Sequence, residues 1–272
     1  MAATQDKITY QRLQDTNGLM LSDAHYQGFA FKPHYHLDYH IGVISKGLQK
    51  QNLNGNRLLL GDGSVSIMPP GQIHDGEGQA GGDYLLKTIR IEPELLIDYG
   101  IDICDAEIDL HRPGISQHDP KLARQLIQLH TQLGQQQRLN DIASETQLMQ
   151  VLQPIFQQLH QLKPCADNGK LNKVQLQKVV DYCQALLDNK INLADLSGLL
   201  DLSRYQFLRR FARSVGMTPH AWLLQLRLEK ACQLLRRTDN PHKDIAAEVG
   251  FFDESHFSRA FKRHYGVTPS HY

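Results

Sequence analysis

The first third of the chain carries short hydrophobic segments of the kind that form β-strands. Residues 39–45, 57–68 and 84–92 are rich in branched aliphatic side chains, and Gly, Asn and Pro residues separate these segments. Closely spaced strands joined by tight turns are typical of a small antiparallel barrel or sandwich. We therefore predict a β-domain over residues 20–92.

From residue 119 onward the hydrophobic positions recur every three or four residues, which predicts amphipathic helices. Asp119 and Pro120 stand where an N-cap and a first helical residue belong. Pro154 predicts a kink in the second helix. The apolar stripes are Leu122, Leu126, Leu129 and Leu133 in one helix, and Leu148, Leu152, Ile155, Leu159 and Leu162 in the next.

Two interpretations of these Gln-rich middle helices, residues 119–162, stay open. Their apolar stripes can pack on the β-domain, or they can form the interface of a homodimer. Residues 163–170 have the composition of a linker. We therefore predict a first domain of residues 1–165 and a second of residues 166–272.

Composition narrows the class of protein. The chain has 272 residues, enough for two domains, and 41% hydrophobic with 21% charged residues is the balance of a soluble globular protein. No apolar run approaches the ~20 residues needed to span a bilayer, and the N-terminus lacks the apolar core of a signal peptide. We therefore expect a cytoplasmic protein without membrane contact. The four cysteines are scattered, which disfavours a disulfide framework or a cysteine zinc site.

The last third of the chain repeats itself at an offset of 50 residues, between residues 203–222 and 253–272. Each copy follows a predicted short helix, residues 192–203 or 243–253, so each predicts a helix-turn-helix unit. Asp201 and Gly250 stand in the two turns, where a left-handed residue is expected. The matched pairs are Phe207 and Phe257, Arg209 and Arg259, Phe211 and Phe261, Arg213 and Arg263, Gly216 and Gly266, and Thr218-Pro219 and Thr268-Pro269.

The helical period divides each repeat into a core face and a polar face. Phe207, Phe211 and Val215 share one apolar stripe, as do Phe257, Phe261 and Tyr265. The side chains off the stripe suit contacts to DNA bases and phosphates, because arginine pairs with guanine and polar side chains bond base edges. These candidates are Arg204, Tyr205, Leu208, Arg209 and Arg213 in the first unit, and Ser255, His256, Arg259 and Arg263 in the second.

Charge favours the same interpretation, although a solvated polar face is the alternative. Residues 171–272 hold 15 Lys and Arg against 10 Asp and Glu, whereas the preceding residues hold 14 against 19. An excess of basic residues confined to the end of the chain predicts that this end meets a polyanion.

The segment "DIAAEVGFFDESHFSRAFKRHYGVTPSHY", residues 244–272, resembles the C-terminal signature of the AraC/XylS transcriptional regulators, and the resemblance extends back to about residue 171. It implies two helix-turn-helix units joined by a long helix, here residues 220–237, that enter successive major grooves ~34 Å apart. By position, the bases would be contacted by Tyr205, Leu208 and Arg209, and by Ser255, His256 and Arg259. Arg210 stands where the family usually has a core aliphatic residue, which predicts a side chain that snorkels towards a phosphate and a weaker first unit.

The stretch "FKPHYHLDYHIGV" gathers three histidines and a carboxylate in the β-domain: His34, His36, Asp38 and His40. In a straight strand His34 and His40 would lie about 20 Å apart at ~3.3 Å per residue, too far to share an ion. A shared site therefore requires a turn at Leu37, Asp38 and Tyr39. The cluster is open to three interpretations: a metal site, a small-molecule pocket, or a hydrogen-bonded corner.

The spacing of Gly28, His34, His36, His40 and Gly47, and that of Gly63, Pro69, Gly71 and His74, resembles the two motifs of cupin barrels. The region also resembles the sensor domain of AraC-type regulators. The resemblance implies that His34, His36, Asp38, His40 and His74 contact an effector. It also implies a possible divalent metal, zinc, iron or nickel, at His34, His36, His40 and His74. His40 stands where a glutamate ligand is usual.

These features together predict an α+β chain: a cupin-like β-barrel, then helices, then an all-α domain with two helix-turn-helix units. We expect a transcriptional regulator, not an enzyme, that binds promoter DNA and a small-molecule effector, forms a homodimer through the middle helices, and contacts RNA polymerase if it activates. The alternatives are a cupin metalloenzyme or metal-dependent sensor fused to a DNA-binding domain, and a DNA-architectural protein without an effector. The sequence names neither the effector nor the operator.

Overall fold

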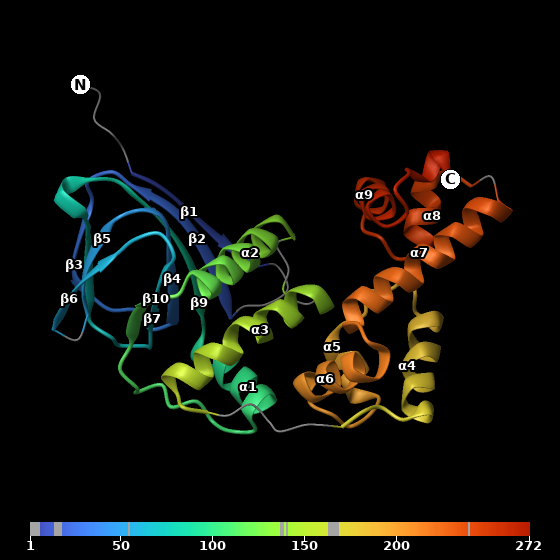
Figure 1. Ribbon diagram of the computed structural model, residues 1–272, viewed down its shortest axis with the longest axis horizontal. Coiled ribbons are helices and arrows are strands. Elements are labelled where there is room, and N and C mark those ends of the chain that lie inside the picture. Colours follow the sequence, from blue (N-terminus) through green and yellow to red (C-terminus); the bar gives the residue numbers. More distant parts are fainter. Residues whose placement is uncertain are drawn as a thin grey trace. The chain divides into compact units, whose positions relative to one another are not determined.

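The chain folds into two compact units, one from residues 1–140 and 144–166 and the other from residues 141–143 and 167–272 (Figure 1). The computed structural model describes residues 6–13, 18–53, 55–136, 139, 141–162, 169–238 and 240–272. The predicted boundary at residue 165 lies outside these ranges. Within them, none of the helices combines the length and the apolar composition of a membrane span.

The first unit contains two antiparallel sheets. One has the strand order β1-β2-β9-β4-β7-β10 and the other the order β3-β8-β5-β6. The strands are β1 (Lys7–Arg12), β2 (Leu19–Tyr26), β3 (Ala30–His34), β4 (Tyr39–Gly47), β5 (Gln49–Leu53), β6 (Asn56–Leu60), β7 (Ser64–Met68), β8 (His74–Gly78), β9 (Tyr84–Ile91) and β10 (Ile115–His118). The predicted cupin-like β-domain is confirmed. It extends beyond residues 20–92, because β1 and β10 join the edges of the larger sheet.

The α-helices that the structure describes in this unit are α1 (Pro93–Cys104), α2 (Pro120–Gln136) and α3 (Ile142–Leu159). The sequence pattern did not predict α1. The predicted cap of α2 is confirmed, because the carboxylate of Asp119 accepts a hydrogen bond from the amide of Leu122 at 2.9 Å. Pro154 lies inside α3, as expected. Figure 1 shows α2 and α3 beside the larger sheet.

The apolar stripes of α2 and α3 are buried within the chain. Leu129, Leu133, Leu152 and Ile155 have no exposed surface, and α2 packs against β4, β7 and β9. Of the predicted stripe residues, Leu162 alone is only half-buried. The structure thus favours packing on the barrel. Because these stripes are already buried within one chain, they do not need a second chain to cover them.

The second unit is helical over the residues described. Its helices are α4 (Lys173–Ala185), α5 (Leu193–Gly198), α6 (Arg204–Val215), α7 (Pro219–Arg237), α8 (His242–Glu248) and α9 (Glu254–Tyr265). The pairs α5–α6 and α8–α9 are in contact and form the two predicted helix-turn-helix units, and α7 is the predicted linking helix.

The sequence repeat is also a structural repeat. The two recognition helices, α6 and α9, are 12 residues each and begin after side-chain N-caps, Ser203 and Asp253. Both end at a left-handed glycine, Gly216 or Gly266, with φ of 83° and 81°. Because each cap occurs at the same position of the repeat, the 50-residue offset fixes both the length and the ends of the two helices.

The aromatic cores of the two units match as well. The rings of Phe211 and Trp222 lie 5.6 Å apart, and those of their counterparts, Phe261 and Tyr272, lie 5.3 Å apart. Phe207 and Phe257 have no exposed surface, which confirms them as core residues. The last stripe positions, Val215 and Tyr265, are only half-buried because they lie in the final turn of each helix.

The turn between α8 and α9 depends on glycine at position 250. Gly250 has φ of 80°, and a Cβ there would overlap the carbonyl oxygen of Leu187 and the guanidinium of Arg227. We expect Gly250→Ala to cost about 1–2 kcal/mol for the left-handed backbone alone, with the overlap adding to it. Urea unfolding measures the loss. The control is Gly198→Ala, where the Cβ meets open space at the end of α5; it should be neutral or stabilising by up to about 1 kcal/mol. Equal effects of the two changes would contradict this account.

Candidate effector pocket and nucleic-acid interface

The chain bends between His34 and His40, and this bend brings the histidines of the β-domain together. Strand β3 ends at His34, a bend occupies residues 37–38, and β4 begins at Tyr39, so the turn that a shared site requires is present. His34 lies directly across from His74 in the pairing of β3 with β8. The amide of Gly71 donates to the carbonyl of His36 at 2.8 Å, which ties the first histidine segment to the second.

Four imidazoles converge at this bend. The ring centroids of His34 and His74 are 4.4 Å apart, and those of His36 and His74 are 5.1 Å apart. One nitrogen from each of these three rings lies within 4.8 Å of the others. His40 stands slightly apart, with its centroid 4.6 Å from that of His36 and 6.2 Å from that of His74.

Burial favours the neutral form of three of these imidazoles, those of His36, His40 and His74. Desolvation, with the nearby His74 and Arg90 as smaller causes, lowers the pKa of His36 to about 4. Desolvation also lowers the pKa of His74, and it lowers the pKa of His40 well below its usual range. Neutral imidazole has a free nitrogen lone pair, so the cluster can accept hydrogen bonds or coordinate a cation at neutral pH.

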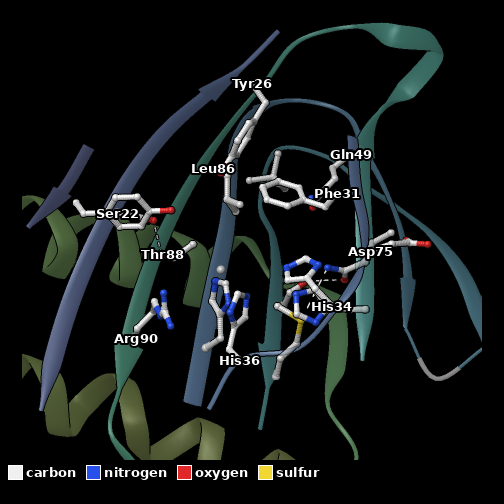
Figure 2. Close-up of a pocket in the computed structure, with 18 residues that line it drawn as sticks. Ser22, Tyr26, Phe31, His34, His36, Gln49, Asp75, Leu86, Thr88 and Arg90 are labelled. Carbon is white, nitrogen blue, oxygen red and sulfur yellow. Dashed lines mark hydrogen bonds between the residues drawn. The ribbon is translucent and has the colours of Figure 1, made fainter. Parts of the chain in front are cut away.

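The histidines form one wall of a cavity of about 70 Å³ that lies between the two sheets (Figure 2). At about 10–15 Å³ per water molecule, this space holds about five waters, so it suits a compact ligand. Figure 2 shows Tyr26, Phe31 and Leu86 at one end and Arg90 with His36 at the other. The cavity therefore offers an apolar surface at one end and hydrogen-bonding groups at the other.

Arg90 is the cation of the polar end. Its guanidinium bonds the carboxylate of Asp38 at 2.6 Å, and its Nε is buried with no hydrogen-bond partner among the described residues. Asp38 itself lies outside the set of described residues that line the cavity. The carboxylate of Asp38 is held by Arg90 and positions that guanidinium, and contact between Asp38 and the effector stays a prediction. His34, His36, His40 and His74 do line the cavity.

Hydroxyl and amide groups complete the polar end. The hydroxyls of Ser22 and Thr88 lie 2.5 Å apart, and Ser66 donates to the side-chain oxygen of Gln51 at 3.0 Å. These residues and Arg90 were missed by the sequence analysis, which considered only the two histidine motifs. The alternation of inward and outward positions along each strand could have identified these residues, because every second residue of a strand faces the same side. On β9 these positions are Leu86, Thr88 and Arg90.

The predicted DNA-contacting side chains of α9 are on the surface. Ser255, His256, Arg259 and Arg263 are all exposed, while Phe257 and Phe261 of the same helix are fully buried. The helix thus has the division between core and polar faces that the sequence predicts. The contacts of these side chains with DNA stay a prediction.

The corresponding face of α6 differs from the prediction. Tyr205 and Leu208 are only 4% and 7% exposed, so these two off-stripe residues are buried in the free chain, and their contacts with bases stay a prediction. Leu208 lies three residues before Phe211 and borders the core stripe, which explains its burial. Arg209 is half-buried, and it donates to the hydroxyl of Tyr205 at 2.9 Å. Arg204, Arg210 and Arg213 are also half-buried, and their contacts with DNA stay predictions.

Comparison with known proteins agrees with this architecture. The description "AraC-like ligand binding domain" matches residues 17–152, and "Helix-turn-helix domain" matches residues 196–272. These two domains define the class of DNA-binding proteins that carry a ligand-binding barrel. The first description covers half of the chain, and the chain belongs to the AraC/XylS family.

Two relatives and one solved structure illustrate the similarity. The probable transcriptional regulator LumQ of Photobacterium leiognathi is 35% identical over 106 residues, which cover 39% of this chain and 43% of LumQ, less than half of its length. The transcriptional activator RhaS of Escherichia fergusonii is 25% identical over 245 residues, 88% of this chain and 86% of RhaS. ToxT of Vibrio cholerae, solved with an unsaturated fatty acid bound, is 16% identical with a TM-score of 0.41 and covers 95% of this chain and 96% of ToxT.

Proposed function

We propose that this protein is a transcriptional regulator that binds promoter DNA through its two helix-turn-helix units and responds to a small effector in the barrel cavity. The observation that carries the proposal is the cavity itself. It lies inside an AraC-like ligand-binding domain, it is lined from both sheets, and the same chain carries two matched DNA-binding units.

The cavity supports a particular class of effector. Its small volume favours a compact molecule, and Tyr26 and Phe31 offer aromatic surface to an apolar part of it. Arg90, with a buried and unpartnered Nε, favours a carboxylate or another hydrogen-bond acceptor at the other end. Binding would change DNA affinity only if the effector binds one conformation of the regulator more tightly than another.

The proposal includes no catalysis, and it places the regulator in the cytoplasm with the promoter. The relatives RhaS and LumQ are named as transcriptional regulators, which supports a role without turnover. A homodimer through the middle helices and contact with RNA polymerase remain predictions. Because the leucine stripes of α2 and α3 are already buried, any dimer through these helices would have to use their polar faces.

The test uses the full-length chain and the DNA upstream of its own gene. A library of small metabolites is first screened by thermal shift, and each hit is then added to a fluorescence-anisotropy titration of that DNA. We expect at least one hit to change the DNA dissociation constant by about 5- to 150-fold, the usual range of such coupling.

Two variants place the response in the cavity. We expect Arg90→Gln to weaken the response to the hit while DNA binding without effector is retained. Arg57→Gln, a matched change at an exposed residue of β6, should keep both. If hits stabilise the chain but none alters DNA binding, the proposed coupling is wrong. If none stabilises it, an architectural DNA-binding protein is favoured.

A further inference from the structure

Two of the clustered histidines have a fixed tautomer. Nδ1 of His34 lies 2.9 Å from the carbonyl oxygen of Lys32, and Nδ1 of His74 lies 3.0 Å from that of Gln72. A carbonyl oxygen can only accept, so each Nδ1 must carry the proton and donate it. The Nε2 of each ring is then left with its lone pair. Metal-binding histidines are commonly oriented in this way by a carbonyl behind the ring.

The distances fit a single ion after a small movement. A tetrahedral ion with histidine ligands at about 2.0–2.1 Å holds the coordinating nitrogens about 3.4 Å apart. In this structure one nitrogen each of His34, His36 and His74 already lies within 4.8 Å of the others. The remaining difference of about 1.4 Å is within reach of side-chain rotation in two half-exposed residues, His34 and His36.

His40 adds an independent observation. Its ring is buried, with 9% of the residue exposed, and neither ring nitrogen has a hydrogen-bond partner among the described residues. An unpartnered polar group is costly in a protein interior. Its ring faces that of His36 at 4.6 Å. A ligand bound at the three-histidine group would provide the partner that His40 lacks.

We propose that His34, His36 and His74 bind one divalent transition-metal ion of the zinc, nickel or iron(II) type, and that His40 contacts the ion or one of its other ligands. Three protein ligands leave at least one coordination position open. Because the three histidines line the cavity, that position is available to an effector with a donor oxygen. The proposal rests on the proposed function, since it assigns a component to the same effector site.

The chemistry of the donor set supports this choice of ion. Neutral imidazole suits zinc, nickel, copper and iron, whereas calcium and magnesium prefer oxygen ligands. The cluster has no thiolate among its described members. Arg90 lies beside His36 at the polar end of the cavity, where its positive charge would favour an anionic group bound to the ion.

The experiment measures ion binding directly. The full-length chain, purified without an affinity tag and treated with a chelator, is titrated with zinc or nickel chloride in a calorimeter, and with iron(II) under anaerobic conditions. We expect one ion per chain for at least one of these metals. Visible absorption of the Co²⁺-loaded chain gives a second readout that reports the ligand set. Failure of all three metals to bind at one ion per chain would overturn the proposal.

Substitutions assign the ligands. We expect His36→Ala and His74→Ala each to weaken metal binding by at least about 100-fold. Loss of a residue that only hydrogen-bonds to a metal ligand usually weakens binding by about 10- to 100-fold. His36→Gln repeats the test with a side chain that stays polar, and circular dichroism checks that each variant is folded. The matched control is His118→Ala, an exposed histidine on β10 of the same unit, which should leave binding unchanged. Folded variants that bind the metal as tightly as the parent chain would also overturn the assignment.

The outcomes separate this proposal from the proposed function. If no metal binds but a metabolite still alters DNA affinity, the metal site is wrong and the regulator stands. If one ion binds through these histidines but neither the ion nor any metabolite alters DNA affinity, the site stands and the effector-responsive function fails.

Discussion

Replacement of Phe261 by alanine is expected to remove about 3–5 kcal/mol of stability from the DNA-binding unit. The ring has no exposed surface and packs in a core with Leu228, Ile245 and Phe257. It also contacts two further aromatic rings, with centroid distances of 4.7 Å to Tyr265 and 5.3 Å to Tyr272. Truncation leaves a cavity at the centre of this cluster, and domains are typically stable by only about 5–15 kcal/mol.

The effect is measured by urea unfolding followed by circular dichroism, together with binding of the upstream DNA. We expect the midpoint of the variant to fall sharply and its specific DNA binding to weaken at temperatures near that midpoint. Lys262→Ala on the same helix is the control, because its side chain is exposed and the change should stay within about 0.5 kcal/mol. An unchanged midpoint for Phe261→Ala would show that this ring is not central to the core.

The sequence predicts the DNA-binding unit well because its signals are local. The N-caps Ser203 and Asp253 and the left-handed glycines Gly216 and Gly266 each depend on a few neighbouring residues. Because the repeat occurs twice, each of these local features is present at the same position of both units. The helical period does not predict the burial of Leu208 and Tyr205 at the border of the stripe, because the core face is wider than three residues per helix indicate.

The barrel is harder to predict because its site is built across strands. The histidine segments were recognisable, and the need for a bend at residues 37–39 followed from strand geometry alone. The position of Arg90 beside His40 was not recognisable, because it depends on the register between β9 and β4. Register is a non-local property, so the pairing of Arg90 with Asp38 and the dependent role of that carboxylate appear only in the folded chain.

Removal of the guanidiniums of Arg209 and Arg259 is expected to abolish most of the sequence specificity. These arginines occupy the same position of the two recognition helices, 50 residues apart. An arginine that contacts guanine contributes about 1–3 kcal/mol of discrimination, so each alanine variant should bind the specific site about 5- to 150-fold more weakly. The two losses should add in free energy, because the residues lie in separate helix-turn-helix units.

We expect the contribution of Arg209 to DNA binding, but not that of Arg259, to depend on a neighbouring side chain. Arg259 is exposed, whereas Arg209 is half-buried and held by Tyr205, whose hydroxyl accepts its hydrogen bond and whose ring centroid lies 5.4 Å from its guanidinium carbon. We therefore expect Tyr205→Phe to weaken specific binding through Arg209 alone, with no further loss once Arg209 is alanine. Fluorescence anisotropy with specific and scrambled DNA at equal salt measures each step. Arg57→Ala, which removes the same charge from the barrel, is the control. If both arginine variants bind the specific site as tightly as the parent chain, the assignment of Arg209 and Arg259 to base contacts is wrong. The residues that contact bases would then lie elsewhere on α6 and α9.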